Sequence, residues 1–559
     1  MNKEEKIRQD EVRKVYLGKA PDLGGIALPV SRGGLLKAFW SLSTLFLGWL
    51  FWGSRGNING ETFLVTSVLV VLCLTPSLLW CSGRVSGLPI FPSFSLTFLP
   101  TYVIPLWKGT RSLASYTSLE INTAGWTLAA FLGVGLLFWH QVCSKNRTTP
   151  SRIMMIEQVR SEWILMGCIL LQVVFEIGIF FFKEFGEGVF PIIRGLTSSA
   201  GRLGLFIFSY QMGKGSLSTG YKGLFIVCLS AILIRQTSSL LLSTAIPTVG
   251  IVFSAYILGR GKIPWIPLLA TVFTLAVLQL GKVEMREQYF SGEKQMSLLN
   301  AGGFFSEWVG YGFKNMGVWE SKDAKREDIE SVQERGSLVQ VMLKIQQKTP
   351  SQLPYLEGET YRYIPEMLIP RIFNKEKIWV HAGNMILSVY YGFLEQEKIF
   401  QTSIAFDPII EAYANFGYAG VFFIATIMGA MIGFTTNLTT RVPMLSFRFL
   451  AGVQLMATLL ASFNTAGVLV TSLWQSLISL VLLSLVLMKK MPNPLFAKPE
   501  SVRRLSDGED GLADHGSGGV RSENDGRSVT KSSITALAEQ GQLRHERPHR
   551  YIYKGNKVK

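Results

Sequence analysis

The sequence predicts an all-α polytopic membrane protein with about 12 transmembrane helices and one large, partly helical extracytoplasmic loop. Three observations predict this class. Hydrophobic residues make up 48% of the 559 residues, and they come in blocks of about 20, the length that a helix needs to cross a bilayer. The blocks lack the alternation that a membrane β-barrel requires. One long polar segment, residues 282–407, interrupts the series.

Nine spans are expected before the long segment and three after it. The third is interrupted by several prolines and the sixth has only a short apolar core, so either could be a re-entrant segment. The expected spans cover about 35–53, 62–81, 88–106, 124–142, 162–182, 196–212, 217–234, 240–259, 264–281, 408–434, 446–468 and 470–488.

The distribution of Lys and Arg predicts the orientation. With the N-terminus in the cytoplasm, the basic loops also fall inside, and an even number of spans returns the C-terminus to the same side. The first span is expected to be an uncleaved anchor, and the polar tail to be disordered. The expected parts are a cytoplasmic N-terminus (1–34), a nine-helix region (35–281), the extracytoplasmic loop (282–407), a three-helix region (408–488) and a cytoplasmic tail (489–559).

The net charge of +16 does not by itself indicate a nucleic-acid partner. The basic residues are concentrated in the termini and short loops, as the positive-inside bias requires, so no nucleic acid is expected. The five cysteines lie in or beside apolar blocks without C-x-x-C spacing, which predicts neither a metal site nor a disulfide framework.

The long segment has a helical pattern of its own. One helix is expected to end at Pro350 and to place Ile329, Val332, Val339 and Met342 near one face. A second short helix is expected around Tyr361, Ile364 and Leu368, interrupted by Pro365 and Pro370.

The segment returns to the membrane at Asp407-Pro408, a favourable helix start because Asp can cap the helix and Pro suits its first turn. Such a helix places Glu411 and Asn415 one turn apart on one face, at the outer interface.

Basic and aromatic side chains are frequent in and beside this segment. Guanidinium groups bind phosphate oxygens through two parallel hydrogen bonds, and aromatic faces stack on sugar rings. The alternative is that these residues are ordinary interfacial anchors and an aromatic belt. The basic set is Lys282, Arg286, Arg335, Arg362, Arg371, Lys375, Lys377 and His381.

Three further ionisable residues have two interpretations each. Arg235 is either a functional charge at membrane depth or part of a tight outer turn, RQTSS. Glu176 lies within an expected span and either pairs structurally with a basic or polar group inside the bundle or has a catalytic role. His381 is either a general base or an ordinary hydrogen-bonding residue.

Several stretches resemble the O-antigen polymerase (Wzy-like) family of polysaccharide polymerases. They are ERGSLVQVMLKIQQKTP, PYLEGETYRYIPEMLIPRIFNKEK, GNMILSVYYG and TSIAFDPIIEAYANFGYAGV, together with GKVEMRE at the start of the segment. The order of the motifs carries the resemblance, which covers roughly residues 282–425. FNKEK stands where the family form W-P-x-K-P is expected.

The resemblance implies a GT-C-like membrane glycosyltransferase of the bacterial inner membrane. Such an enzyme joins repeat units outside the membrane and transfers glycan from an undecaprenyl-pyrophosphate donor to an acceptor sugar. It needs mainly positioning and cationic stabilisation of the leaving diphosphate, so no metal or cofactor is expected. The implied partners are the lipid-linked oligosaccharide, membrane lipid, and chain-length regulator and flippase proteins.

The same resemblance suggests roles for particular residues. Glu411 is the first candidate for activating the acceptor hydroxyl and His381 the second. The substrate-binding candidates are Arg286, Arg335 and Arg371 for the diphosphate, with Arg235 as a lesser candidate, then Lys282 and Lys375, and finally Asn384, Tyr391 and Asn415 for sugars.

Other functions share parts of this pattern. An O-antigen ligase would have the same span layout and late loop. A transferase that uses polyprenyl-monophosphate sugars would resemble its class by an acidic pair in the first outer loop, where only Glu61 is found. A transporter or flippase should show paired, broken helices in two repeated halves, which are absent. A non-catalytic assembly protein could dock through its basic tail.

Overall fold

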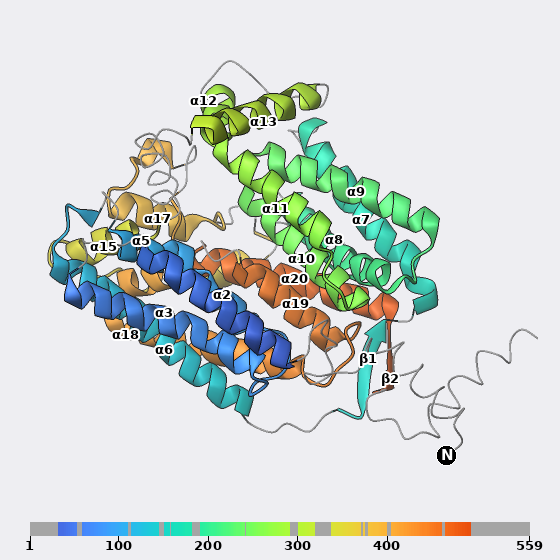
Figure 1. Ribbon diagram of the computed structural model, residues 1–559, viewed down its shortest axis with the longest axis horizontal. Helices are drawn as coiled ribbons and strands as arrows, with labels where there is room; N and C mark the ends of the chain where they lie inside the picture. Colours follow the sequence, from blue (N-terminus) through green and yellow to red (C-terminus); the bar gives the residue numbers. More distant parts are fainter. Residues whose placement is uncertain are drawn as a thin grey trace, which may run out of the picture. The chain divides into compact units, whose positions relative to one another are not determined.

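The computed structural model describes thirteen stretches of the chain, which are mostly helical (Figure 1). All of them belong to one compact unit that extends from Met1 to Pro499. The described residues are 32–52, 59–109, 113–144, 150–156, 158–181, 190–240, 242–290, 300–318, 337–369, 373–374, 378–399, 404–460 and 464–493.

The helices before the long segment are α2 (Arg32–Trp52), α3 (Gly60–Cys81), α4 (Ile90–Leu96), the π-helix η1 (Leu99–Val103), α5 (Ile104–Lys108), α6 (Ser118–Ser144), α7 (Gln158–Phe181), α8 (Phe190–Lys214), α9 (Thr219–Ser238), α10 (Leu242–Arg260) and α11 (Trp265–Leu280). The later ones are α12 (Lys282–Phe290), α13 (Ala301–Val318), α15 (Val339–Lys348), α16 (Ile364–Leu368), α17 (Ala382–Tyr390), the 3-10 helix η4 (Gln396–Lys398), α18 (Pro408–Leu438), α19 (Phe447–Leu460) and α20 (Ala466–Leu487). Two strands, β1 (Arg152–Ile156) and β2 (Met488–Pro492), complete the described elements.

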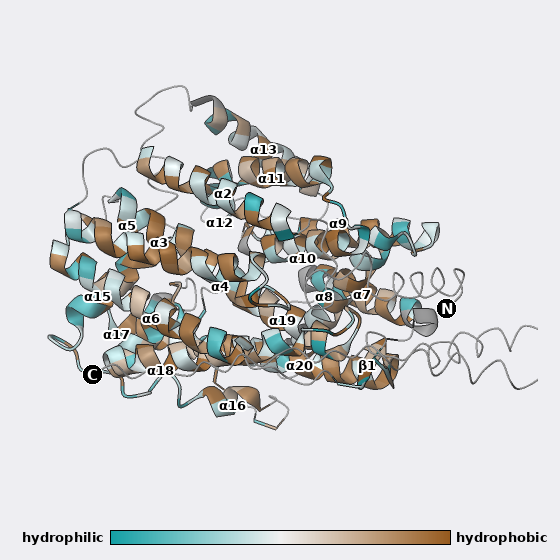
Figure 2. Ribbon diagram, turned by 60° about the horizontal axis from the view of Figure 1, so that its bottom comes forward, coloured by the Kyte–Doolittle hydropathy of each residue, from teal (hydrophilic) through white to brown (hydrophobic). Residues whose placement is uncertain are grey.

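Several of these helices can cross a membrane. Within the described ranges, six are long and apolar enough: α2, α3, the continuous stretch Ile90–Lys108, α6, α18 and α20. Helices α11 and α12, bent by 53° at their junction, add a seventh if they form one span. Hydrophobic residues dominate α3 and α18 in Figure 2. The expectation of an all-α membrane protein is therefore supported, and the number twelve stays a prediction.

The proline-rich third segment is one continuous helical stretch. It changes from α4 to the π-helix η1 and then to α5, and Pro100 and Pro105 fall in the first turns of η1 and α5. A proline cannot donate the regular backbone hydrogen bond of an α-helix, and both changes of helix type fall beside these prolines.

The expected boundary between the last two spans was wrong. Helix α19 ends at Leu460 and α20 already begins at Ala466. Thr465 has extended backbone angles and is the residue that starts α20. Local hydrophobicity alone did not show this break.

Packing between helices brings distant parts of the chain together. Helix α6 lies between α3 and α18, while α8 packs against α7 and α10. Helix α20 contacts α8, α16, α17 and α19, so it joins these groups. Helices α6 and α18 approach closely at Gly135 and Gly429, which have no side chains. A Cβ atom on Gly429 would lie only 2.4 Å from the carbonyl oxygen of Gly135.

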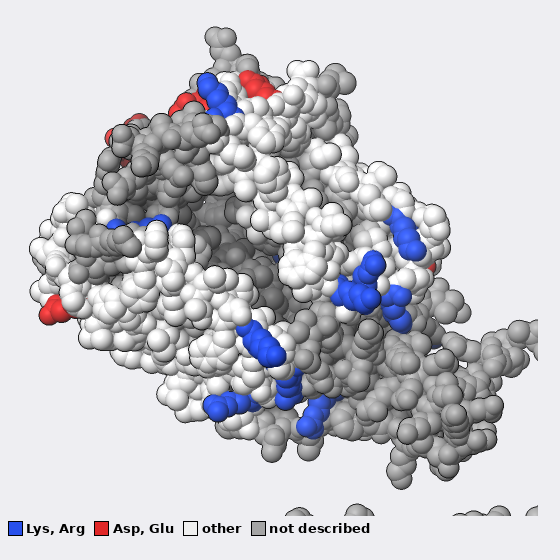
Figure 3. All heavy atoms as spheres, in the orientation of Figure 1, with Lys and Arg blue, Asp and Glu red and all other residues white. Residues whose placement is uncertain are grey.

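The ends of several helices meet at one end of the bundle, around residues 150–156, 441–446 and 488–493, which is here called the basic end. Strand β1 pairs antiparallel with β2, which places Met154 opposite Lys490. Asn493 donates hydrogen bonds to the carbonyl groups of Pro150 and Arg441 at 3.2 and 3.3 Å. Figure 3 shows most of the visible Lys and Arg side chains toward the bottom and right of the view, where Figure 1 places β1 and β2. Acidic side chains are visible mainly toward the top and left.

The opposite end holds the described parts of the long segment. Gln347 of α15 donates to Glu120 at the start of α6 at 3.0 Å. Helix α15 ends directly before Thr349-Pro350, as expected for its C-terminus, whereas Ile329 and Val332 lie outside the described residues. The second short helix is α16, and its Pro365 lies in the first turn instead of interrupting it. Tyr361 lies in the preceding turn.

Candidate functional site

The start of α18 is built around a buried carboxylate. Asp407 Oδ1 accepts hydrogen bonds from the backbone N–H groups of Ile409 and Ile410 at 3.0 and 2.8 Å. Its Oδ2 accepts one from the hydroxyl of Tyr102 in η1. The helix start predicted from Asp407-Pro408 is confirmed. Burial raises the pKa of Asp407 to about 6, against the opposing effect of these hydrogen bonds.

Glu411, one turn further along α18, is completely buried. Its Oε2 accepts a hydrogen bond from the backbone N–H of Ala466 at 2.6 Å, at the N-terminus of α20, where negative charge is favourable. Within the described ranges, its Oε1 has no hydrogen-bond partner. A Cβ atom on Gly383 would lie 3.2 Å from this oxygen and 3.3 Å from Thr465 Oγ1. Glycine is therefore what lets α17 pack directly against the carboxyl group.

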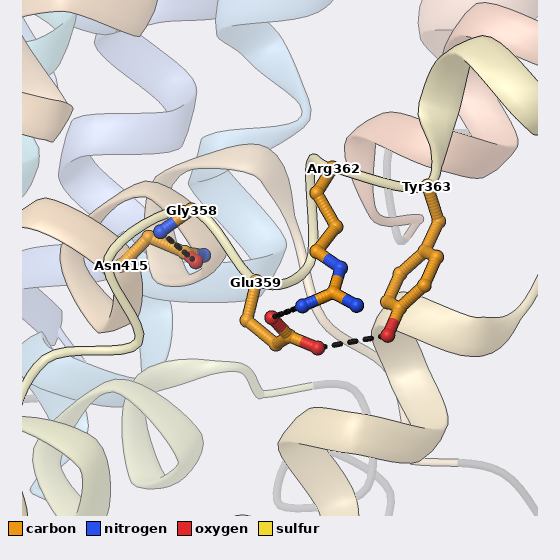
Figure 4. A network of polar contacts seen from close by, with 5 residues as sticks. All are labelled: Gly358, Glu359, Arg362, Tyr363 and Asn415. Atoms are coloured by element: carbon orange, nitrogen blue, oxygen red, sulfur yellow. Dashed lines mark hydrogen bonds and ion pairs between the residues drawn. The ribbon is translucent and has the colours of Figure 1, made fainter.

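Asn415 joins α18 to the turn before α16 (Figure 4). Its Oδ1 accepts from the backbone N–H of Gly358 at 3.1 Å, and its Nδ2 donates at 2.8 Å to both Thr360 Oγ1 and the carbonyl group of Glu411. Beside it in the view, Glu359 accepts from Arg362 and Tyr363, both at 2.8 Å. The prediction that Glu411 and Asn415 share one face of a helix is consistent with this contact.

Asn384 of α17, like Asn415 of α18, uses its side-chain amide to connect separate segments of the chain. Its Nδ2 donates to the carbonyl of Ile404 at 3.1 Å, and its Oδ1 accepts from Thr465 Oγ1 at 2.7 Å. Helices α17, α18 and α20 thus meet through buried polar groups. Four segments that are distant in sequence, 358–360, 383–384, 411–415 and 465–466, converge here; this set is called the carboxylate cage.

The pKa of Tyr361 responds to the two buried carboxylates, Glu411 and Asp407. Its ring stacks on Phe416, with centroids 6.0 Å apart and planes 3° from parallel. Burial raises its pKa well above 10, and the charges of Glu411 and Asp407 add to the effect. Both carboxylates therefore act on the same turn of the long segment.

The three predicted sugar contacts have protein partners. Asn384 and Asn415 belong to the carboxylate cage and are at most 4% exposed. Tyr391 is buried, and its hydroxyl shares a 2.8 Å hydrogen bond with Thr349 Oγ1. Burial raises the pKa of Tyr391 to about 12. Structural roles account for these contacts, and sugar binding by these side chains stays a prediction.

His381 lies beside the carboxylate cage. It is the residue before α17 and is exposed to solvent, two positions from Gly383. The two candidates for activating the acceptor hydroxyl are therefore close in space. They differ in access, because the histidine faces solvent while Glu411 lies behind Gly383.

The second group of candidates meets at the turn between α9 and α10. Arg235 Nε donates to the carbonyl of Glu176 at 3.1 Å, and its Nη1 donates to Ser238 Oγ at 3.4 Å. Arg286 Nη2, from α12, donates to the carbonyl of Leu240 at 3.1 Å. Two guanidinium groups that are 51 positions apart thus contact residues 238 and 240 of one turn; this pair is called the arginine pair.

Arg235 does not lie in a tight turn, so that interpretation was wrong. Helix α9 continues through Arg235 to Ser238, and the side chain is half-buried. Arg235 contacts the backbone carbonyl of Glu176, so the expected pairing of the Glu176 side chain with a basic or polar group stays a prediction. A helical pattern followed by RQTSS did not distinguish a last helical turn from a loop.

The other cationic candidates are placed only in part. Lys282 is the first residue of α12, directly after the bend, and is half-buried. Arg335, Arg371 and Lys375 lie outside the described residues.

Two lysines were missed. Lys344 and Lys348, one turn apart on α15, donate to the carbonyl groups of Gly392 and Tyr391, both at 3.0 Å. Lys344 also lies over the ring of Phe393, 4.2 Å from its centroid. Burial, and then the charge of Lys348, lower the pKa of Lys344. The i, i+4 spacing was the available signal.

No protein-family model, curated protein or solved structure matches this chain.

Proposed function

We propose that this protein is a membrane glycosyltransferase that polymerises lipid-linked oligosaccharide repeat units, as O-antigen polymerases do. The donor is an undecaprenyl-pyrophosphate-linked glycan and the acceptor is a sugar hydroxyl. In this proposal the chain crosses a bacterial inner membrane twelve times in a GT-C-like arrangement, with both termini in the cytoplasm. The carboxylate cage and the arginine pair then face the extracytoplasmic side.

The charge distribution supports this orientation. Arg152, Arg441, Lys489 and Lys490 lie at the basic end, which the contacts between residues 150–156, 441–446 and 488–493 hold together. Cytoplasmic segments of membrane proteins carry such an excess of Lys and Arg. The carboxylate cage lies at the far end of α18 and α20, which are both long enough to span a bilayer.

The observation that carries the proposal is the arginine pair. Both guanidinium groups reach the same turn between α9 and α10, where a doubly charged diphosphate would contact the two together. Guanidinium groups suit this ligand because each can bind two oxygens at once. The diphosphate is a good leaving group, and the arginines would stabilise the charge that develops on it.

The proposed step is a single transfer of the glycan. The acceptor oxygen forms a bond to the anomeric carbon, and the bond from that carbon to the diphosphate oxygen breaks. The bonding electrons leave with the diphosphate, whose charge the arginine pair stabilises. The proton of the acceptor hydroxyl passes to a base at the start of α17. His381 is accessible there, and Glu411 becomes accessible if α17 shifts at Gly383.

The test uses the purified full-length chain in nanodiscs with a lipid-linked repeat unit. Replacing Arg286 or Arg235 with Ala should lower polymer formation about 100-fold or more, the typical effect of losing one group that stabilises developing charge. Arg260→Ala, at the other end of α10, is the matched control and should keep full activity. Unchanged chain growth in a stably folded Arg286→Ala variant would refute the proposal. Product attached only to a foreign acceptor would identify a ligase instead.

A further inference from the structure

A second arginine environment lies in the middle of the helix bundle. Arg202 of α8 donates to the carbonyl of Ser198 at 3.4 Å and to Ser199 Oγ at 3.3 Å. Among the residues that the structure describes, no carboxylate forms an ion pair with it. Its side chain is half-buried, and the two printed hydrogen bonds leave other guanidinium N–H groups able to donate.

The positions of residues in α8 and α20 show how deep Arg202 lies in the bundle. Arg202 is 12 residues from either end of the 25-residue α8, about 18 Å at the helical rise. Ser199 Oγ lies 3.2 Å from the hydroxyl oxygen of Ser476, the eleventh of 22 residues in α20, which is long and apolar enough to span a bilayer. An arginine side chain is too short to reach a membrane surface from there.

Polar side chains from four helices lie beside Arg202 at this depth. Gln454 of α19 donates to the carbonyl of Ser199 at 3.0 Å. Gln172 of α7 packs against Gly201, the residue before Arg202. Ser199, Ser476, Gln454 and Gln172 are each at most 2% exposed. This set, together with Arg202, is called the central polar cluster.

The central polar cluster consists of one fixed cation and several groups that can donate hydrogen bonds. Arginine stays charged in proteins, so burial cannot neutralise it as it can a lysine or a carboxylate. A charge at mid-bundle without a counter-charge is costly. Hydroxyl and amide groups can turn their donors toward a negative guest.

We propose that the central polar cluster binds one small inorganic anion between α8 and α20. The guanidinium of Arg202 supplies the charge, and the hydroxyl groups of Ser199 and Ser476 supply additional donors. Mid-bundle depth favours a compact anion over a lipid headgroup, which stays near the interface. The site is separate from the arginine pair, because Arg235 lies in the last turn of α9 and Arg202 in the centre of α8.

The test measures chloride binding to the purified full-length protein in a neutral detergent. Radioactive chloride and thermal unfolding are followed at constant ionic strength, with gluconate as the replacement anion because it is too large for a site between packed helices. One chloride per chain and a chloride-dependent rise in unfolding temperature are expected. Absence of both in the wild-type protein would overturn the proposal, as would equal stabilisation by gluconate.

Variants locate the site. Arg202→Gln should weaken chloride binding at least 100-fold, while Arg260→Gln, at an exposed arginine in the last turn of α10, should leave it unchanged. If Arg202→Gln fails to fold, Ser199→Ala decides: it keeps the charge and should weaken binding about tenfold, the effect of one hydrogen bond to a charged group. Wild-type affinity in Ser199→Ala and in any folded Arg202 variant would place the anion elsewhere and refute the assignment.

Discussion

Replacing Glu411 with Gln separates two roles of this residue. As a structural group, Glu411 accepts the hydrogen bond from Ala466 N–H that joins α18 to the start of α20. As a catalytic group, it would take the proton of the acceptor hydroxyl. Gln has nearly the same shape, and its carbonyl oxygen can still accept from Ala466. Its amide group would lie beside Gly383, where Thr465 Oγ1 can accept a hydrogen bond.

The expected cost in stability is small for Gln and larger for Ala. A buried hydrogen bond to a charged group contributes about 1 kcal/mol more than a neutral one, so Glu411→Gln should lower the free energy of unfolding by about 1 kcal/mol. Glu411→Ala leaves the Ala466 N–H without an acceptor and a void beside α17, which should cost about 3 kcal/mol.

The expected effect on turnover is larger, because a positioned general base contributes about 100-fold to 10,000-fold. Thermal unfolding in detergent and polymer formation in nanodiscs measure the two quantities separately. A stable Glu411→Gln variant that turns over like the wild type would refute the catalytic role and leave only the structural one. His381→Gln, measured in parallel, then shows whether the exposed histidine is the base.

Two further predictions follow from buried contacts. Burial raises the pKa of Asp407 from 3.8 to about 6, so the folded state holds this proton more tightly than the unfolded state. About 3 kcal/mol of folding stability should therefore be present below pH 3.8. This stability should be lost as the pH rises through 6. Unfolding measured against pH should show this loss, Asp407→Asn should abolish it, and Tyr102→Phe should shift it to higher pH; an identical profile in Asp407→Asn would refute the assignment. Gly417→Ala should destabilise the protein by about 1–3 kcal/mol, since φ is +62° there and a Cβ atom would lie 2.8 Å from the hydroxyl oxygen of Tyr355; a wild-type unfolding temperature would contradict this.

The sequence by itself determined the class of the protein and several local features. Apolar blocks of about 20 residues need only composition to indicate membrane helices, because the bilayer leaves no other way to satisfy the backbone. Asp407-Pro408 likewise specifies a helix start through neighbouring residues alone, as the cap on Ile409 and Ile410 shows. Pro350 marked the end of α15 for the same local reason.

Only the tertiary structure decided which side chains meet. Glu411 and Ala466 are 55 positions apart, as are Asn415 and Thr360, and nothing in the local pattern pairs them. Burial of Asn384 and Tyr391 likewise depends on helices packed from elsewhere in the chain. The position of Arg202 in the bundle, and the convergence of Arg235 and Arg286 on one turn, were not visible in the sequence. Periodicity tells which face of a helix is apolar, whereas the identity of the facing helix depends on long-range packing.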